Sequence, residues 1–190
     1  MFQKKSIKIR PATWEAFQQV MGEKGGCGGC WCMLWRLSHQ QMEAQKGIKN
    51  KLAMKAVFQS GKSPGLVAFD GNKAIGWIQF APRSEFPRLK TSRILKPVDD
   101  KEVWSVSCFL VHKTHRNQGL SLSLLDAACQ HAEISGARIL EGYPIEPNKT
   151  PYPPVYAWVG FASVFKKAGF EEIARRSETR PIMRKVLKRS

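Results

Sequence analysis

The residues best placed for chemistry are those of the segment Arg116-Asn-Gln-Gly-Leu-Ser121. An apolar, β-prone run at 103–111 precedes this segment, and apolar residues at helical spacing follow it from Leu120 to Ile134. The segment therefore joins a strand to a helix. A glycine at such a junction lets backbone approach a ligand, and the free N–H groups of the helix start favour an anion. We expect a pyrophosphate group to bind at this junction. The alternative is that the glycine only allows the chain to turn.

A second candidate is the cysteine cluster in Gly25-Gly-Cys-Gly-Gly-Cys-Trp-Cys32. Three thiols in a glycine-rich turn could converge on a soft metal, because thiolates bind zinc. A structural zinc site needs a fourth ligand, and His39 is the nearest candidate. The two other interpretations are a redox or acceptor-lining role and the packing of small apolar residues.

Alternating and helical patterns predict the elements that hold these segments. The strands are expected at 6–10, 66–69, 74–80, 103–111, 137–144, 171–176 and 180–187, the last as an edge strand. Helices are expected after Thr13, within 40–61 with a break near Gly47, from Leu120 to Ile134, and within 160–170, with a short turn at 86–89. A hairpin turn is expected at Asp70-Gly71-Asn72. We expect one domain over residues 1–190.

Arg116-Asn-Gln-Gly-Leu-Ser, after Phe109-Leu-Val-His, resembles the acetyl-CoA motif of the GNAT family of N-acetyltransferases, (Gln or Arg)-x-x-Gly-x-(Gly or Ala). Ser121 departs from the last position, although it is small. The hairpin with Gly76-Trp77 resembles two strands of the same family, and Phe165 to Phe170 resembles its second signature, Tyr-x-x-x-Gly-Phe. The resemblance covers nearly the whole chain. It implies an α/β (α+β) fold with a mixed, mostly antiparallel central sheet, flanking helices and a splayed central pair of strands.

The resemblance also implies where acetyl-CoA, the co-substrate, would bind. A bulge in the strand at 103–111 would turn backbone groups toward pantetheine, with the N–H of Leu110 polarising the thioester carbonyl. The implied cofactor-binding residues are Phe109, Leu110, Val111, Arg116, Asn117, Gln118, Gly119, Leu120 and Ser121. The implied acceptor-binding residues lie in the cysteine loop and the proline-rich segment: Cys27, Cys30, Trp31, Cys32 and Tyr152.

Two residues on the next strand are candidates for proton transfer. Glu141 and Tyr143 stand two apart and so point to the same side of a strand. If that side faces the splayed gap, Glu141 could accept the proton of the amine and Tyr143 could donate one to sulfur; the alternative is that both are ordinary hydrogen-bonded residues. Two family positions differ here: Phe165 replaces the tyrosine that protonates the leaving thiolate, and Ser105 stands where some relatives carry a glutamate base.

Composition limits the location and the partners of the protein. Lys and Arg number 31 against 15 Asp and Glu, a formal net charge of +16 that attracts polyanions without selecting one. CoA, an acidic acceptor and nucleic acid all remain open, as does a merely basic surface. The first residues lack the apolar run of a signal peptide and no segment spans a membrane, so a cytoplasmic location is expected, with thiols rather than disulfides.

The expected function is transfer of the acetyl group of acetyl-CoA to a small-molecule or peptide amine by direct attack. The alternative is a catalytically weak basic module of the same fold that binds RNA or the ribosome. No RNA-binding signature or row of stacking aromatics supports this alternative. A small cysteine-dependent redox or metal protein ranks last because it leaves the rest of the sequence unexplained. Monomer and homodimer both stay open.

Overall fold

The computed structural model describes residues 7–148, 152–153 and 156–188. The strands are β1 (Ile7–Pro11), β2 (Gly65–Asp70), β3 (Lys73–Pro82), β4 (Trp104–Val111), β5 (Ile139–Gly142), β6 (Glu171–Arg175) and β7 (Pro181–Val186). The α-helices are α1 (Trp14–Met21), α2 (His39–Ala44), α3 (Ile48–Gln59), α4 (Pro87–Thr91), α5 (Leu120–Ile134) and α6 (Ala162–Lys167). Short 3-10 turns lie at Cys27–Gly29, Arg83–Glu85 and Lys113–His115. These elements follow the predicted order, except that Ser6 lies outside the described residues.

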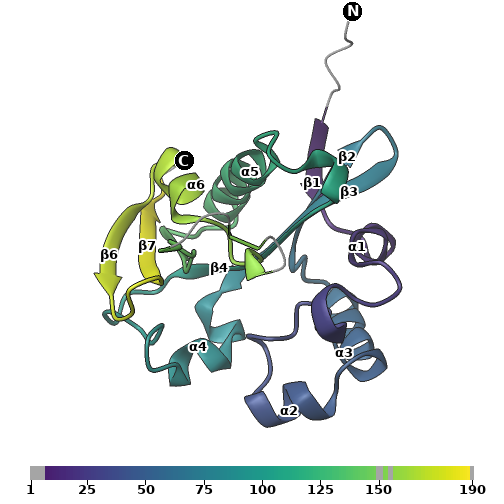
Figure 1. The fold of residues 1–190 in the computed structure, drawn as a ribbon, viewed down its shortest axis with the longest axis horizontal. Helices are drawn as coiled ribbons and strands as arrows, with labels where there is room; N and C mark the ends of the chain where they lie inside the picture. Colours follow the sequence, from purple (N-terminus) through teal and green to yellow (C-terminus); the bar gives the residue numbers. More distant parts are fainter. Residues whose placement is uncertain (1–6, 149–151, 154–155, 189–190) are drawn as a thin grey trace, which may run out of the picture.

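The strands form one sheet in the order β1-β2-β3-β4-β5-β7-β6 (Figure 1). All neighbours are antiparallel except β4 and β5, which are parallel. The predicted mixed, mostly antiparallel sheet flanked by helices is therefore confirmed. The prediction that the last strand is an edge strand is wrong: β7 lies between β5 and β6, and β6 forms the edge. Alternation of side chains along one strand carries no information on which strands flank it.

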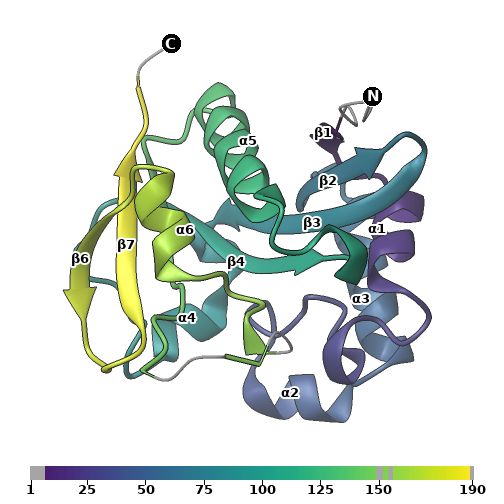
Figure 2. The same cartoon turned by 45° about the horizontal axis from the view of Figure 1, so that its top comes forward.

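Helices cover both faces of the sheet (Figure 2). Helices α5 and α6 pack on one face, where Leu124, Ala128 and Phe165 join a core with β2 to β5. On the other face, α1 and the cysteine loop pack on Trp77 of β3. A third apolar cluster beside α4 includes Tyr143. The molecule thus has an α5/α6 face and an α1/α4 face, with β4 accessible to both layers.

Local chemistry explains why the helices on the α1/α4 face begin and end where they do. The Thr13 hydroxyl accepts a hydrogen bond from the Ala16 amide at 3.2 Å and caps the start of α1. Gly22, with φ +66°, ends the helix. The predicted break near Gly47 is also present, since this residue, with φ +80°, precedes α3. These caps place the cysteine loop, residues 22–37, between α1 and α2.

Candidate active site

Strand β4 carries an extra residue at the centre of the sheet. Its register with β3 pairs Gln79 with Cys108 and then Phe80 with Val106, which leaves Ser107 as the bulged residue. The bulge implied by the family resemblance is therefore present. Because a bulge bends the strand and disrupts the ladder, it directs β4 away from its parallel neighbour beyond this point.

Strands β4 and β5 separate directly after the bulge. Their pairing runs from Trp104 opposite Leu140 to Val106 opposite Gly142 and then ends. Beyond it, the Phe109 amide donates to the carbonyl of Trp158 at 2.6 Å, and the Ile145 amide donates to the carbonyl of Gly160 at 2.9 Å. The segment 158–161 therefore lies against both strands where they diverge, as a local continuation of the sheet.

The register of β4 decides which amides face the opening. The His112 amide donates to the Ile75 carbonyl of β3 at 2.8 Å. Since donors alternate between the two edges of a strand, the Leu110 amide also faces β3, and those of Phe109 and Val111 face the β5 side. The polarising role expected of the Leu110 N–H does not fit this register. Val111 is the better placed donor.

The loop from β4 to α5 has the backbone that the sequence predicted. Asn117 and Gly119 have φ values of +59° and +79°, and Gly119 caps α5 without any side-chain hydrogen bond. Arg116 is exposed and its Nε donates to the Val111 carbonyl at 3.1 Å, which orients the guanidinium at the mouth of the opening. The Gln118 amide group donates to the Thr114 carbonyl at 2.9 Å. Leu120 is buried, whereas Ser121 is half-buried.

The surroundings of this loop are basic. Burial and then the positive charges of Lys73, Lys113 and Arg116, with His115, lower the pKa of His112 below its ordinary value. No acidic side chain lies in the first turn of α5. A helix start with uncapped N–H groups and cationic neighbours is suited to an anion with several charges.

The cysteine loop packs on β4 from the α1/α4 face. Cys32 is buried, and its thiol donates to the sulfur of Cys108 at 3.3 Å. A Cβ on Gly26 would lie 3.8 Å from Leu110 Cδ1. The loop predicted to bind the acceptor is therefore adjacent to the strand predicted to bind pantetheine.

The four residues proposed for acceptor binding in this loop differ in exposure. Cys27 is exposed and Cys30 is half-buried. Trp31 is only 2 % exposed, stacks with Trp14 at 6.2 Å between ring centroids, and lies under Lys51 at 5.0 Å. Its indole is a core residue, so contact with an acceptor falls to Cys27, Cys30 and the residues that follow.

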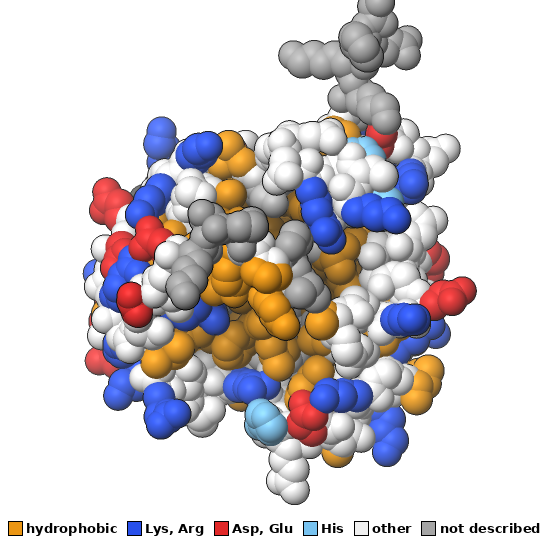
Figure 3. Space-filling model, in the orientation of Figure 1, with side chains coloured by type: hydrophobic (Ala, Val, Ile, Leu, Met, Phe, Trp, Pro, Cys, Tyr) orange, Lys and Arg blue, Asp and Glu red, His pale blue; other side chains and the backbone are white. Residues whose placement is uncertain are grey.

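Apolar side chains gather over the middle of the face on which β4 lies between α6, α4 and α2, with Lys and Arg around them (Figure 3). Trp35 and Trp158 approach each other, with ring centroids 6.2 Å apart, and so bring the end of the cysteine loop close to the segment 158–161. Tyr152, the other predicted acceptor residue, is half-buried, lies edge-on to Phe161, and lines a cavity of about 300 Å³ with Ile145. It is part of the wall beside α6 rather than of the cysteine loop.

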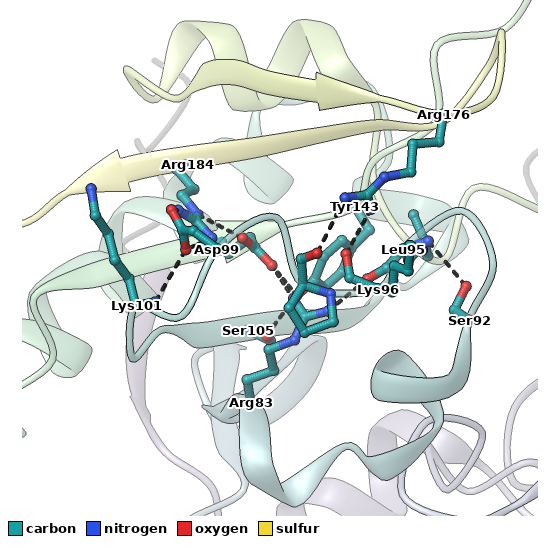
Figure 4. Close-up of polar contacts among 12 residues, drawn as sticks. Arg83, Ser92, Leu95, Lys96, Asp99, Lys101, Ser105, Tyr143, Arg176 and Arg184 are labelled. Carbon is teal, nitrogen blue, oxygen red and sulfur yellow. Dashed lines mark hydrogen bonds and ion pairs between the residues drawn. The ribbon is translucent and has the colours of Figure 1, made fainter.

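Tyr143 lies in a buried polar network with Ser105 and Arg83 (Figure 4). Glu141 points to the same side of the chain, as predicted, and belongs to the same network. The Tyr143 hydroxyl donates to Glu141 Oε1 at 2.6 Å and pairs with the Ser105 hydroxyl at 2.8 Å. Arg83 donates to the same Glu141 oxygen, and Arg184 Nε donates to Oε2 at 2.6 Å. Glu141 is 0 % exposed.

This arrangement opposes the roles predicted for the pair. Both carboxylate oxygens of Glu141 already accept from guanidinium groups, and the side chain is fully buried, so the carboxylate is not exposed to an incoming amine. Burial and the neighbouring Glu141 charge raise the pKa of Tyr143 well above its ordinary value, so the phenol keeps its proton. The geometry supports the second interpretation, of hydrogen-bonded residues that join β5 to its neighbours.

Sequence reasoning missed Gln79 and Ser107. The Ser107 hydroxyl donates to Gln79 Oε1 at 2.8 Å, and Gln79 Nε2 is buried without a partner among the described residues. An unpaired buried donor costs free energy, which makes this amide a candidate ligand group beside the bulge. A signal existed, because Gln79 is the polar residue within the apolar run Ala74 to Ala81.

Comparison with known families shows the family to which this chain belongs. The model described as the Acetyltransferase (GNAT) family matches residues 31–161, more than half of the chain. The chain belongs to the GNAT family of acetyltransferases. The predicted membership of the GNAT family is thereby confirmed. Acetyl-CoA, the acetyl donor of this family, is the co-substrate.

Solved structures of acetyltransferases share the fold at low sequence identity. PaiA N-acetyltransferase from Thermoplasma acidophilum, in complex with coenzyme A, has a TM-score of 0.54 at 18% identity, covering 95% of this chain and 99% of that one. YncA from Salmonella typhimurium, with its cofactor acetyl-CoA, gives 0.59 at 16% identity, covering 96% and 94%. An N-acetyltransferase from Staphylococcus aureus Mu50 gives 0.58 at 14% identity, covering 96% and 99%. No curated protein matches the sequence.

The residues of this acetyltransferase fit acetyl-CoA at the pyrophosphate end. A Cβ on Gly119 would meet nothing within 4 Å, so the space over its backbone is open to a ligand. At the pantetheine end, the Val111 amide faces the opening, whereas the Phe109 amide is held by Trp158. Segment 158–161 would therefore have to release Phe109 for this amide to bind the pantetheine arm.

Two further findings concern the acetyltransferase as a whole. Within the described residues, no three His, Cys, Asp or Glu side chains are arranged to hold a metal ion. None of the described helices is long and apolar enough to cross a membrane.

Phe165, at the family's tyrosine position, is 0 % exposed and packs edge-on to Phe109 at 6.0 Å. Its role is therefore to pack against β4, and it has no proton to give to a leaving thiolate.

Proposed function

We propose that this acetyltransferase acetylates an amine by direct attack of the amine on acetyl-CoA. The observation that carries the proposal is the divergence of β4 and β5 directly beside the uncapped, basic start of α5. The first feature provides an opening for an amide-rich arm, and the second provides a site for its pyrophosphate. The two lie on one continuous piece of chain, from Trp104 to Ile134.

The residues from Arg116 to Ser121 bind the pyrophosphate in this proposal. The guanidinium of Arg116, held by the Val111 carbonyl, pairs with a phosphate oxygen, while the N–H groups around Gly119 and Leu120 surround it. Asn117 and Gln118 complete the loop. Phe109, Leu110 and Val111 line the arm, and the Val111 amide stabilises charge on the acetyl oxygen during attack. The bound acetyl-CoA supplies the activated acetyl group.

The acceptor approaches from the α1/α4 face. The cysteine loop contacts β4 there, and its Trp35 lies beside Trp158 of the segment 158–161. Cys27, Cys30 and Tyr152 are the proposed acceptor contacts, with Trp31 and Cys32 setting the shape of the loop. The acceptor is a small-molecule or peptide amine, and the site is in the cytoplasm, where the five free thiols are kept reduced.

Water takes the proton of the amine in this proposal. Ser105 stands at the family's glutamate position, is 0 % exposed and is bonded to Tyr143. Phe165 has no proton for the departing thiolate. Turnover therefore depends on positioning and on the stability of the CoA thiolate more than on a dedicated acid and base.

The Arg116→Ala variant tests the donor site. Loss of a charged hydrogen bond costs about 1.5 to 3 kcal/mol, so the Kd for CoA should rise roughly tenfold or more in isothermal titration calorimetry. Arg93→Ala is the matched control, because Arg93 is also exposed but lies between α4 and β4. Equal CoA affinity in the Arg116→Ala variant and the wild type would remove this role from Arg116.

A further inference from the structure

Two cysteines from distant parts of the chain meet on β4. The sulfur of Cys32, in the cysteine loop, lies 3.3 Å from the sulfur of Cys108, although 76 positions separate them. A disulfide has its sulfur atoms about 2.05 Å apart, so the bond needs an approach of roughly 1.3 Å. Cys32 Sγ also lies 4.0 Å from the sulfur of Met21. The pair is therefore close enough to bond after a small adjustment.

The cysteine loop is built so that Cys32 is held in this position. Trp31 and Cys32 have φ values of +47° and +57°, a conformation that side chains other than glycine rarely adopt. A Cβ on Gly25 would lie 2.1 Å from Trp31 Nε1, and one on Gly29 would lie 2.7 Å from the Gly47 amide nitrogen. Such strain persists only where the surroundings fix it, and it marks functional segments more often than inert ones.

Two further thiols lie earlier in the same loop. Cys27 is exposed and begins the 3-10 turn Cys27–Gly29, and the half-buried Cys30 follows this turn, with its amide donating to the Cys27 carbonyl at 3.3 Å. Cys30 also lies close enough to Cys32 and Cys108 to interact with both electrostatically. Cys30, Cys32 and Cys108 thus form one group of neighbouring thiols at the strand that carries Phe109 and Leu110.

We propose that Cys32 and Cys108 are a site of reversible oxidation, at which a peroxide converts the two thiols to a disulfide. One thiol attacks the peroxide and becomes a sulfenic acid as the first water or alcohol leaves. The second thiol then attacks the sulfenic sulfur and releases water. The two thiols lose two electrons and two protons, and the peroxide accepts them. A dithiol reductant reverses the bond by exchange.

The bond joins the acceptor-side loop to the cofactor strand. In the reduced protein this junction consists of van der Waals contacts and one weak thiol hydrogen bond, from Cys32 to Cys108. The disulfide would fix the loop at the residue before Phe109. This inference goes beyond the acetyl transfer, and it holds whether or not the protein acetylates an amine.

Burial sets the rate of this oxidation. Hydrogen bonding from Cys32 and then burial raise the pKa of Cys108 well above its ordinary value, and burial with the neighbouring Cys32 raises that of Cys30 to about 11. Because the thiolate is the nucleophile, the pair should oxidise slowly at neutral pH and faster as the pH rises. An accessible surface thiol such as Cys27 should react first.

Peptide mapping of the full-length protein tests the proposal. After treatment with hydrogen peroxide and digestion with trypsin without reductant, peptide 25–36 should be linked to peptide 102–113, with a mass lower than their sum by two hydrogen atoms. The Cys27→Ser/Cys30→Ser double variant leaves Cys32 as the only thiol in the first peptide and should keep the link. Dithiothreitol should remove it.

Single variants decide which sulfurs are joined. Cys108→Ser and Cys32→Ser should each abolish the linked peptide, and Cys129→Ser, in the α5 core, should leave it unchanged. Circular dichroism of each variant verifies that it is folded. A link that is absent from the wild type after exhaustive oxidation, or one that connects peptide 102–113 through Cys27 or Cys30 alone, would overturn the assignment.

Discussion

Glu141 illustrates what the sequence could predict for a single side chain and what it could not. Spacing by two placed Glu141 and Tyr143 on one side of a strand, and the hydrogen bond of 2.6 Å between them agrees. The partners Arg83 and Arg184 come from elements 58 and 43 positions away. No local pattern in the sequence reveals such pairings. Only the fold shows that Glu141 lies in a buried network and is not an exposed proton acceptor.

The Glu141→Gln variant separates a structural from a catalytic role. Loss of the charge leaves the largely buried Arg83 without its carboxylate partner and leaves Arg184 with Asp99, so the free energy of unfolding should fall by about 3 to 5 kcal/mol. Urea denaturation measures this loss. Turnover per folded molecule should change little.

Asp99→Asn is the control for Glu141→Gln. Asp99 binds the same Arg184, at 2.7 and 3.0 Å, but from an exposed position. Its loss should be much smaller, because solvent screens the pair. If Glu141→Gln instead leaves stability intact and lowers kcat, the carboxylate is catalytic and the structural interpretation is wrong.

Local sequence signals were sufficient to predict where most of the strands and helices begin and end. The Thr13 cap, the break at Gly47 and the Gly71 turn each depend on one residue with a clear conformational preference. The β4 bulge and the parting of β4 from β5 came from the family resemblance, and the place of β7 was predicted incorrectly. Strand neighbours depend on contacts between segments far apart in sequence.

Paired glycine variants test the loop between β4 and α5. Gly119 and Gly71 both have positive φ, +79° and +60°, and a Cβ on either would meet no atom within 4 Å. Replacing each with alanine should therefore cost a similar free energy of unfolding, about 1 to 2 kcal/mol, from backbone strain. Only Gly119→Ala should also weaken CoA binding, because its methyl group lies where the pyrophosphate is proposed.

Calorimetry with CoA, together with thermal denaturation of both variants, measures this difference. Gly71 lies in the β2–β3 hairpin, away from the loop, and reports the strain alone. If both variants bind CoA as tightly as the wild type, the backbone at Gly119 does not approach the ligand. That result would limit the site to the Arg116 side chain.

In the whole molecule, the proposed cofactor site and the proposed acceptor site lie on different parts of the surface around β4. The start of α5 offers an anion site, and apolar side chains bordered by basic groups gather between α6, α4 and α2 (Figure 3). The net charge of +16 draws polyanions to either, so charge does not distinguish a CoA enzyme from an RNA-binding module. Chemistry distinguishes them, because only the enzyme cleaves the thioester in the presence of an amine.

Release of free thiol from acetyl-CoA over a panel of small amines and peptides is therefore the most direct test of the account. If the protein transfers acetyl to an amine, thiol release should depend on the amine, mass spectrometry should detect an acetylated product, and the Arg116→Ala variant should strongly reduce both. The opposite result is that no amine causes release of free thiol and that the wild-type protein binds RNA in a salt-sensitive manner. That result would contradict the proposed acetyl transfer.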